Sequence, residues 1–470
     1  MVLTSYTCWM EELKINLIMQ KQIALFFIII VLLSFNSSKA QNSAGSDSML
    51  TIQGCVDIAL KNNLLVQTSE IAMQTAKVNR NQAIDNLLPS NVGAGGSQGE
   101  YAGKSLNLTN YTYVNQKVSS GSYFLQGSIL LFEGLYYQNT IKQNKYAFDA
   151  SKMDLQTQKD NITLGVILAY YQVLSFQEQL VIAREQVDVD AKQVDRLDLQ
   201  NQSGALLILQ NLSDLQGQLA SDKGNVVNTI SNLETAKISL FQLLNIPYNR
   251  NAQYEPIPLN LDLVGYGTNS DSIFRIALSN LPVIKSVDLK VKEFRKALAA
   301  MRGQYYPQLS LGGSENSNYS SASLNTSGGK IPFGTQFNND LNTYYGFQLY
   351  IPIFNQLRTR NNVKLAKINL ENAVIMDNGA RLTLQQNVEQ AYQNMVAAYG
   401  SYKSLLDQVT AYKESFRSAE IRFNEGVITS DLYLLAKNNI NRANTNLAAA
   451  KYNYIFRTKI LDYYQGRLMW

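Results

Sequence analysis

The sequence has no histidine and almost no cysteine, and both absences restrict its chemistry. Without histidine there are no Ser-His or Cys-His nucleophile pairs and no histidine-ligated metal site. The two cysteines are Cys8 and Cys55, and Cys8 lies in an N-terminal segment that we expect to be removed, which leaves Cys55 without a disulfide partner in the chain. Because the sequence also lacks a phosphate-binding loop and a cysteine cluster, we expect no enzyme activity, no metal and no cofactor.

The sequence also lacks a strong net charge and a hydrophobic run long enough to cross a membrane as a helix. Its 41 basic and 36 acidic residues are intermixed, which argues against a nucleic-acid partner. The apolar run from Ile23 to Phe35 has 13 residues, fewer than the roughly 20 that a spanning helix needs. Lys21 precedes this run and the small residues Ser38 and Ala40 follow it, so we predict a secretory signal peptide over residues 1–40.

Proline is scarce as well, and its placement predicts long helices. The 470 residues include only eight prolines, with none between Pro89 and Pro247 and none after Pro352. Because a proline inside a helix costs about 3 kcal/mol, both of these stretches are free to form long helices. A helix from Leu135 to Asn201 would extend about 100 Å at 1.5 Å per residue. That length exceeds the diameter of a compact domain, so we expect such helices to project.

The chain contains two related halves. The segment Cys55–Asn63, "CVDIALKNN", resembles Ile273–Leu281, "IFRIALSNL", 218 residues later. The segment Tyr123–Phe132, "YFLQGSILLF", resembles Tyr345–Phe354, "YGFQLYIPIF", 222 residues later. Such an internal repeat predicts a duplicated structural unit. We therefore predict four segments: a signal peptide at 1–40, a first structural repeat at 41–247, a linker at 248–270 and a second structural repeat at 271–470.

Apolar residues recur every seven positions in both proline-free stretches. The first copy has Val166, Val173, Leu180, Val187 and Val194, and 222 residues later the second has Val388, Met395, Tyr402, Val409 and Phe416. Asp190 is the one polar residue at the companion position of this pattern. The period predicts left-handed coiled packing, and it resumes after Gly204 and Gly426, which we therefore place at the tips of helical hairpins. The heptads alone would equally fit a soluble antiparallel coiled coil.

Alternating segments predict two strands in each repeat. One face would carry Tyr345, Phe347, Leu349, Ile351 and Ile353 in the second repeat, and Tyr123, Leu125, Gly127, Ile129 and Leu131 in the first. Segments of about ten residues with this pattern fit outer-membrane strands, although a half-buried soluble hairpin alternates too. Four strands are too few to close a barrel, and lipid does not tolerate open sheet edges. If the strands span a membrane, several copies of the chain must share one barrel.

The order and duplication of these features resemble the TolC family of outer-membrane efflux proteins, from about Leu50 to Gly466. The resemblance implies a mostly α fold with β, in which duplicated long α-helical hairpins form a periplasmic α-barrel. It implies a homotrimer whose four strands per chain form a 12-stranded transmembrane β-barrel in the outer membrane of a Gram-negative bacterium. The function implied is a passive exit duct for substrates expelled by an inner-membrane transporter through a periplasmic adaptor. The alternative is a soluble periplasmic coiled-coil scaffold or adaptor.

The resemblance also implies functional sites at the hairpin tips. The adaptor-docking residues would be Gly204, Ala205 and Leu206 at the first tip and Gly426, Val427 and Ile428 at the second. A plain helix cap would favour glycine there as well. Where family members often carry acids at the closed periplasmic mouth, this sequence has Leu432 and Leu435. Asp431 lies one residue earlier and is our periplasmic gate candidate, because a ring of carboxylates attracts cations, but it also suits the cap of the returning helix.

Overall fold

The computed structural model describes residues 49–107, 111–202, 209–257 and 267–467, and within them one order of elements occurs twice. The first copy comprises α2 (Ile52–Asn62), α3 (Leu64–Asp85), β1 (Ser90–Asn107), β2 (Thr112–Glu133), α4 (Tyr136–Gln202) and α5 (Leu209–Leu244). The second comprises α6 (Ser270–Asn280), α7 (Pro282–Gly303), β3 (Gln308–Ser320), α8 (Phe333–Asn339), β4 (Asn342–Tyr350), α9 (Arg358–Asn424) and α10 (Ser430–Tyr464). Among the described residues, α8 is the one element without a counterpart. The predicted signal peptide and the tip residues Gly204, Ala205 and Leu206 lie outside the described residues.

The duplication extends to the backbone conformation. Both α4 and α9 have 67 residues, and their first residues are 222 positions apart. The turn before α4 has positive φ at Gly134 and Leu135, and the turn before α9 has positive φ at Gln356 and Leu357. A non-glycine residue in this region carries strain of about 1–2 kcal/mol, so the same shape is retained at some cost. The turn from strand into long helix is therefore built in the same way twice.

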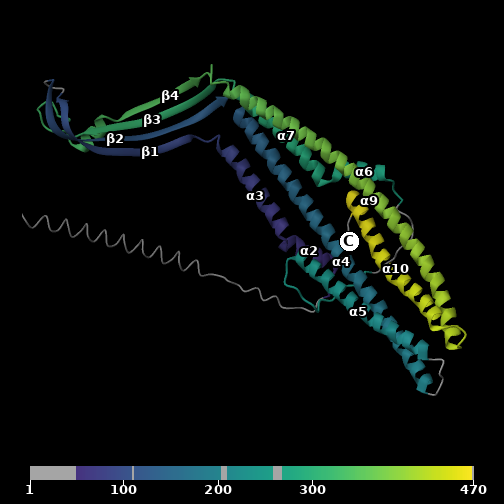
Figure 1. The fold of residues 1–470 in the computed structure, drawn as a ribbon. Helices are drawn as coiled ribbons and strands as arrows, with labels where there is room; N and C mark the ends of the chain where they lie inside the picture. Colours follow the sequence, from purple (N-terminus) through teal and green to yellow (C-terminus); the bar gives the residue numbers. More distant parts are fainter. Residues whose placement is uncertain (1–48, 108–110, 203–208, 258–266, 468–470) are drawn as a thin grey trace, which may run out of the picture. The chain divides into compact units, whose positions relative to one another are not determined.

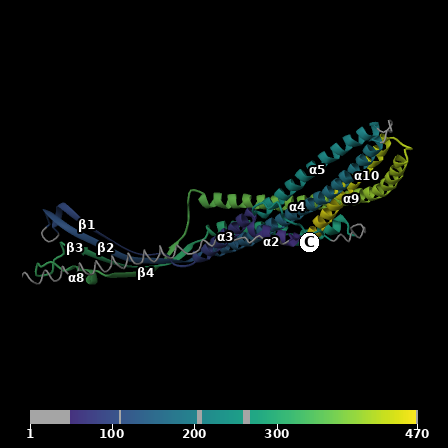
Figure 2. The same cartoon turned by 90° about the horizontal axis from the view of Figure 1, so that it is seen from below.

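The predicted heptad positions nearer the sheet form the helical core, whereas those nearer the tips are half-buried. Val166 and Val173 of α4 are fully buried, and Val388 and Met395 of α9 are nearly so. The helix α4 packs against α3, α5, α7 and α10, while α9 packs against α6, α7 and α10. Figures 1 and 2 both show that the hairpins α4–α5 and α9–α10 end at the same side of the helical region. The heptads thus join the two hairpins into one packed unit.

The predicted four strands are confirmed, and they form one open sheet. All neighbours are antiparallel in the order β1-β2-β3-β4, which Figure 1 shows side by side. Within the described chain, β1 and β4 are the edges of this sheet. One face of β3 and β4 pairs Leu309 with Leu349 and Leu311 with Phe347, whereas the other pairs Ser310 with Gln348. The sheet therefore has one apolar and one polar face.

The predicted end of the last strand was wrong. The strand β4 ends at Tyr350, so Ile351 and Ile353 lie beyond it and are exposed rather than on its apolar face. Pro352 has no N–H to donate to a strand ladder, which explains why the ladder stops here.

The predicted face of β2 was wrong at one position. The pairing with β3 shifts between Leu130 and Phe132, which places Phe132 opposite Leu309. A bulge of this kind adds one residue to one strand and reverses the side-chain alternation beyond it. Phe132, rather than Leu131, therefore joins Leu309 and Leu349 on the apolar face.

Candidate functional site at the hairpin tips

The second hairpin tip is a glycine-dependent helix end. Gly426 has a φ of +73°, and a side-chain carbon added there would meet no atom within 4 Å. Its N–H donates to the Phe423 carbonyl at 3.1 Å, and the Val427 N–H donates to the Arg422 carbonyl at 2.8 Å. These two bonds are the Schellman pattern that closes a helix through a left-handed residue. The backbone conformation, and not lack of space within the chain, therefore favours glycine at this tip.

Two hydrogen bonds attach the start of α10 to the first hairpin. Ser430 is only 2% exposed, and its N–H donates to Asn211 Oδ1 at 3.2 Å. Its hydroxyl donates to Asp214 Oδ2 at 2.7 Å. Both acceptors belong to α5. Of the predicted docking residues at this tip, Val427 is exposed whereas Ile428 is half-buried against the neighbouring apolar side chains.

An apolar cluster from both hairpins supports the tip. This tip cluster consists of Leu197, Leu212, Leu215, Phe423 and Tyr433. The rings of Phe423 and Tyr433 are stacked with centroids 4.6 Å apart, and Tyr433 is fully buried. Burial raises the pKa of the Tyr433 hydroxyl, and this oxygen has no hydrogen-bond partner. The cluster holds the ends of α4, α5, α9 and α10 together directly behind Gly426.

Asp431 lies in the first turn of α10 and is exposed. The hydroxyl of Thr429 donates to its carboxylate, and this bond lowers the pKa of Asp431, so the side chain is ionised at neutral pH. A negative charge at a helix N-terminus is favoured by the helix dipole. Leu432 and Leu435, at the positions where the resemblance implies acids, are also exposed. The geometry fits the helix-end role of Asp431, and its gate role stays a prediction.

A buried ion cluster joins the two hairpins farther along the helices. Lys437 of α10 is 1% exposed and binds Asp190 of α4 and Asp222 of α5, with 3.0 Å between its Nζ and Asp222 Oδ2. Gln218 donates a further hydrogen bond to Asp222 at 3.0 Å. Asp190 is the polar residue that interrupts the heptad pattern, so the structure supplies the reason for that exception. We call Asp190, Asp222 and Lys437 the ion cluster.

The ion cluster contains two carboxyl groups and one ammonium group, so its net charge changes when a carboxyl group takes up a proton. Burial raises the pKa of Asp190 to about 6, and Asp190 Oδ2 accepts no hydrogen bond. Burial also acts on Asp222, but its interaction with Asp190 and its hydrogen bond from Lys437 outweigh that effect and lower its pKa. Asp190 is therefore the member that takes up a proton first as the pH falls.

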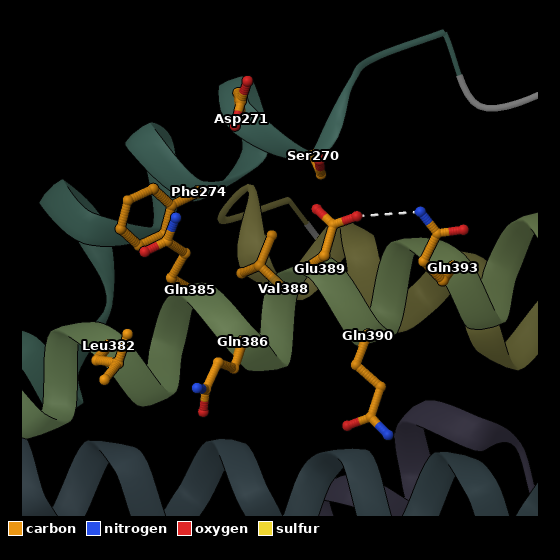
Figure 3. Close-up of a pocket in the computed structure, with 10 residues that line it drawn as sticks. All are labelled: Ser270, Asp271, Phe274, Leu382, Gln385, Gln386, Val388, Glu389, Gln390 and Gln393. Carbon is orange, nitrogen blue, oxygen red and sulfur yellow. Dashed lines mark hydrogen bonds between the residues drawn. The ribbon is translucent and has the colours of Figure 1, made fainter.

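A further cavity lies between α6 and α9. Its volume is about 550 Å³, and its lining is drawn in Figure 3. The carboxylate of Glu389 accepts a hydrogen bond from Gln393 at 3.0 Å, and bonds from Gln393 and Ser270 lower the pKa of Glu389. The lining otherwise consists of amides, Asp271 and apolar side chains such as Phe274. We assign this cavity no function.

Other reactive groups are scarce in the part of the chain that the structure describes. Those residues contain no group of three or more acidic or cysteine side chains placed to hold a metal ion. Cys55 is fully buried in the core, and burial raises the pKa of its thiol to about 12. A thiol with such a pKa is not a nucleophile at neutral pH.

Comparisons with known proteins agree with this arrangement. Residues 55–245 and 274–459 match the family model described as outer membrane efflux protein. The chain is 23% identical over 412 residues to the toxin and drug export protein A of Aggregatibacter actinomycetemcomitans. This alignment covers 85% of this chain and 82% of the relative. It is 24% identical over 352 residues to the outer membrane protein TolC of Escherichia coli. This second alignment covers 73% of this chain and 68% of the relative.

Solved structures show the same fold. The outer membrane protein VceC of Vibrio cholerae superimposes with a TM-score of 0.74 at 14% identity, covering 89% of this chain and 97% of VceC. The CmeC outer membrane channel of Campylobacter jejuni superimposes with a TM-score of 0.70 at 20% identity, covering 88% of this chain and 85% of CmeC. At these identities the likeness establishes the fold alone.

Proposed function

Because this chain belongs to the outer membrane efflux protein family, a family of transport proteins rather than enzymes, we propose that it is the exit duct of a three-component export system. An inner-membrane transporter would expel the substrate, and a periplasmic adaptor would join that transporter to the duct. The observation that carries the proposal is a four-stranded open sheet with one apolar face, continuous in the chain with two long helical hairpins. A toxin or a drug, the cargo named for the Aggregatibacter relative, is the cargo class to test first.

The duct would be a homotrimer. Three copies supply twelve strands, and each edge β4 would pair with the edge β1 of the next copy, which removes the open edges that lipid does not tolerate. An eight-stranded barrel is filled by its own side chains, whereas a larger one leaves an opening. The helices α4 and α9, each about 100 Å long at 1.5 Å per residue, would form the periplasmic tunnel.

The hairpin tips would bind the adaptor. Gly426, Val427 and Ile428 form the second tip, and Gly204, Ala205 and Leu206 would form the first. The exposed side chain of Val427 and the open space around Gly426 support this role, because both leave a partner free to approach the backbone. Asp431, exposed and ionised beside this tip, remains the gate candidate.

The test compares three substitutions of Gly426. Any L-residue at this φ adds strain of about 1–2 kcal/mol, but asparagine tolerates the left-handed region better than alanine or tryptophan. We expect Gly426→Trp to assemble normally and to lose export, because its side chain blocks the approach of the adaptor. Gly426→Asn and Gly426→Ala test strain with a small side chain and should retain most export.

Cross-linking reports docking directly. Cys55 is buried, so Val427→Cys would place an accessible thiol at the tip for cross-linking to the adaptor. The cross-link should form with Gly426 and disappear with Gly426→Trp at unchanged trimer abundance. If trimer abundance falls together with export, the glycine is structural. If export persists with tryptophan, docking occurs elsewhere.

A further inference from the structure

A close backbone contact forms the base of the sheet. The strand β2 turns into α4 through Gly134, and α7 ends at Gly303 shortly before β3. A side-chain carbon added at Gly303 would lie only 2.7 Å from the Gly134 carbonyl oxygen. One added at Gly134 would collide with the Gly303 carbonyl. Both positions therefore need glycine, and their contact fixes the end of α7 against the end of β2.

A cavity of about 580 Å³ lies beside this contact. Its apolar lining includes Phe132, Leu135, Leu298 and Tyr306, and its polar lining is Arg295 and Arg302. Phe132 is the residue that the β2 bulge places on the apolar face of the sheet, opposite Leu309. The cavity thus shares Phe132 with the face that we expect to contact lipid.

The polar lining of this cavity is a pair of arginines from one helix. They are seven residues apart on α7, two helical turns, and both are exposed. Neither forms an ion pair with a described residue, although Lys290 on the same helix pairs with Asp154. The helix α7 carries six basic and two acidic residues. The dipole of α7 accounts for a cation in its last turn, such as Arg302, but not for Arg295 two turns earlier.

We propose that this cavity binds the phosphate of a glycerophospholipid from the periplasmic leaflet of the outer membrane. Arg295 and Arg302 would hold the phosphate, which guanidinium groups bind through paired, charge-assisted hydrogen bonds. Phe132 and Leu135 would contact the acyl chains. The cavity lies where the sheet gives way to the helices, the level at which lipid headgroups meet protein. The proposal rests on the sheet spanning the outer membrane.

The test measures lipid binding to the purified full-length protein in detergent by native mass spectrometry. The variant is Arg295→Gln/Arg302→Gln, and the matched control is Arg184→Gln/Arg275→Gln, which removes the same charge from two other exposed arginines. We expect the variant to raise the apparent Kd for phosphatidylglycerol at least tenfold and the control to change it less than twofold. All proteins should keep the same oligomeric mass, because the four arginines are exposed and unpaired among the described residues.

Two further probes identify the ligand class. Diacylglycerol with the same acyl chains lacks the phosphate and should bind the native protein at least tenfold more weakly. Inorganic phosphate in excess should not displace phosphatidylglycerol, because it lacks the apolar contacts. Equal binding by variant and native protein, equal binding of diacylglycerol, or displacement by phosphate would each overturn the proposal. A protein that exports normally but shows one of these results contradicts the lipid site alone and leaves the exit duct intact.

Discussion

Lys437 neutralises two buried carboxylates, so its removal is the most damaging single change at the ion cluster. We expect Lys437→Met to lower the free energy of unfolding by about 3–5 kcal/mol, because Asp190 and Asp222 would remain buried without a cation. Denaturant unfolding followed by circular dichroism measures this change. Replacing all three residues by apolar ones of similar volume should recover most of the loss, since buried ion clusters seldom exceed apolar packing. If Lys437→Met unfolds like the native protein, the cluster is not buried as described.

Asp190 gives the stability a defined pH dependence. Its carboxyl loses a proton near pH 3.9 in an unfolded chain, whereas burial raises its pKa to about 6 in the fold. Between these values the folded state binds more protons than the unfolded state, so the free energy of unfolding falls as the pH rises from about 4 to about 6. The lowered pKa of Asp222 acts below this window.

The pH prediction is measured against Asp190→Asn, which has no proton to release. We expect the difference in unfolding free energy between native and variant protein to change across pH 4–6 and to level off above it. A constant difference over the whole range would show that Asp190 does not titrate in this window.

The ion cluster shows what sequence patterns reveal about single residues. Asp190 stood out because it interrupts a heptad, and Lys437 lies between Tyr433 and Ile440 on a buried stripe. Asp222 likewise lies between apolar positions of α5. Asp190 was visible as an exception, but its pairing with Lys437 was not, because the two residues are 247 positions apart. Only the packing of α10 against α4 and α5 brings the three together.

At the scale of elements, the orientation of the sheet is testable at neighbouring residues of β4. Leu349 pairs with Leu309 on the apolar face, and Gln348 pairs with Ser310 on the polar face. Arginine on a lipid-facing strand position costs about 2–4 kcal/mol near the membrane midplane and less near the interface. We expect Leu349→Arg to reduce assembled barrel in membrane fractions and Gln348→Arg to leave it nearly unchanged. Equal loss in both variants would mean that the faces are assigned wrongly.

Long elements were predictable and short irregular ones were not. The absence of proline and the seven-residue period predicted α4 as Leu135–Asn201, close to the observed Tyr136–Gln202. The helix α8 was missed because its seven residues carry no period, and its position depends on a hydrogen bond from Gln336 to the Ser320 carbonyl at 2.9 Å. The bulge in β2 was missed because an alternating pattern continues past an inserted residue, and only pairing with β3 reveals the change.

At the scale of the whole molecule, the sequence predicted an outer-membrane efflux channel, and membership of the family confirms this function, location and class. The same membership excludes the alternative of a soluble periplasmic coiled-coil scaffold. The domain boundaries at 41–247, 248–270 and 271–470 stay a prediction.

The strand count predicts the number of copies in the assembled channel. One chain contributes four strands with open edges at β1 and β4, so a monomer cannot be stable in lipid. Two copies would supply eight strands, which close into a barrel filled by side chains, whereas three copies supply twelve and leave a passage. We therefore expect mass measurement in detergent to give a trimer, and the same preparation to conduct ions in a planar bilayer. A stable monomer contradicts the shared barrel, and a dimer without conductance contradicts the open one. Mass and conductance together distinguish a closed barrel without a passage from a barrel that can transport.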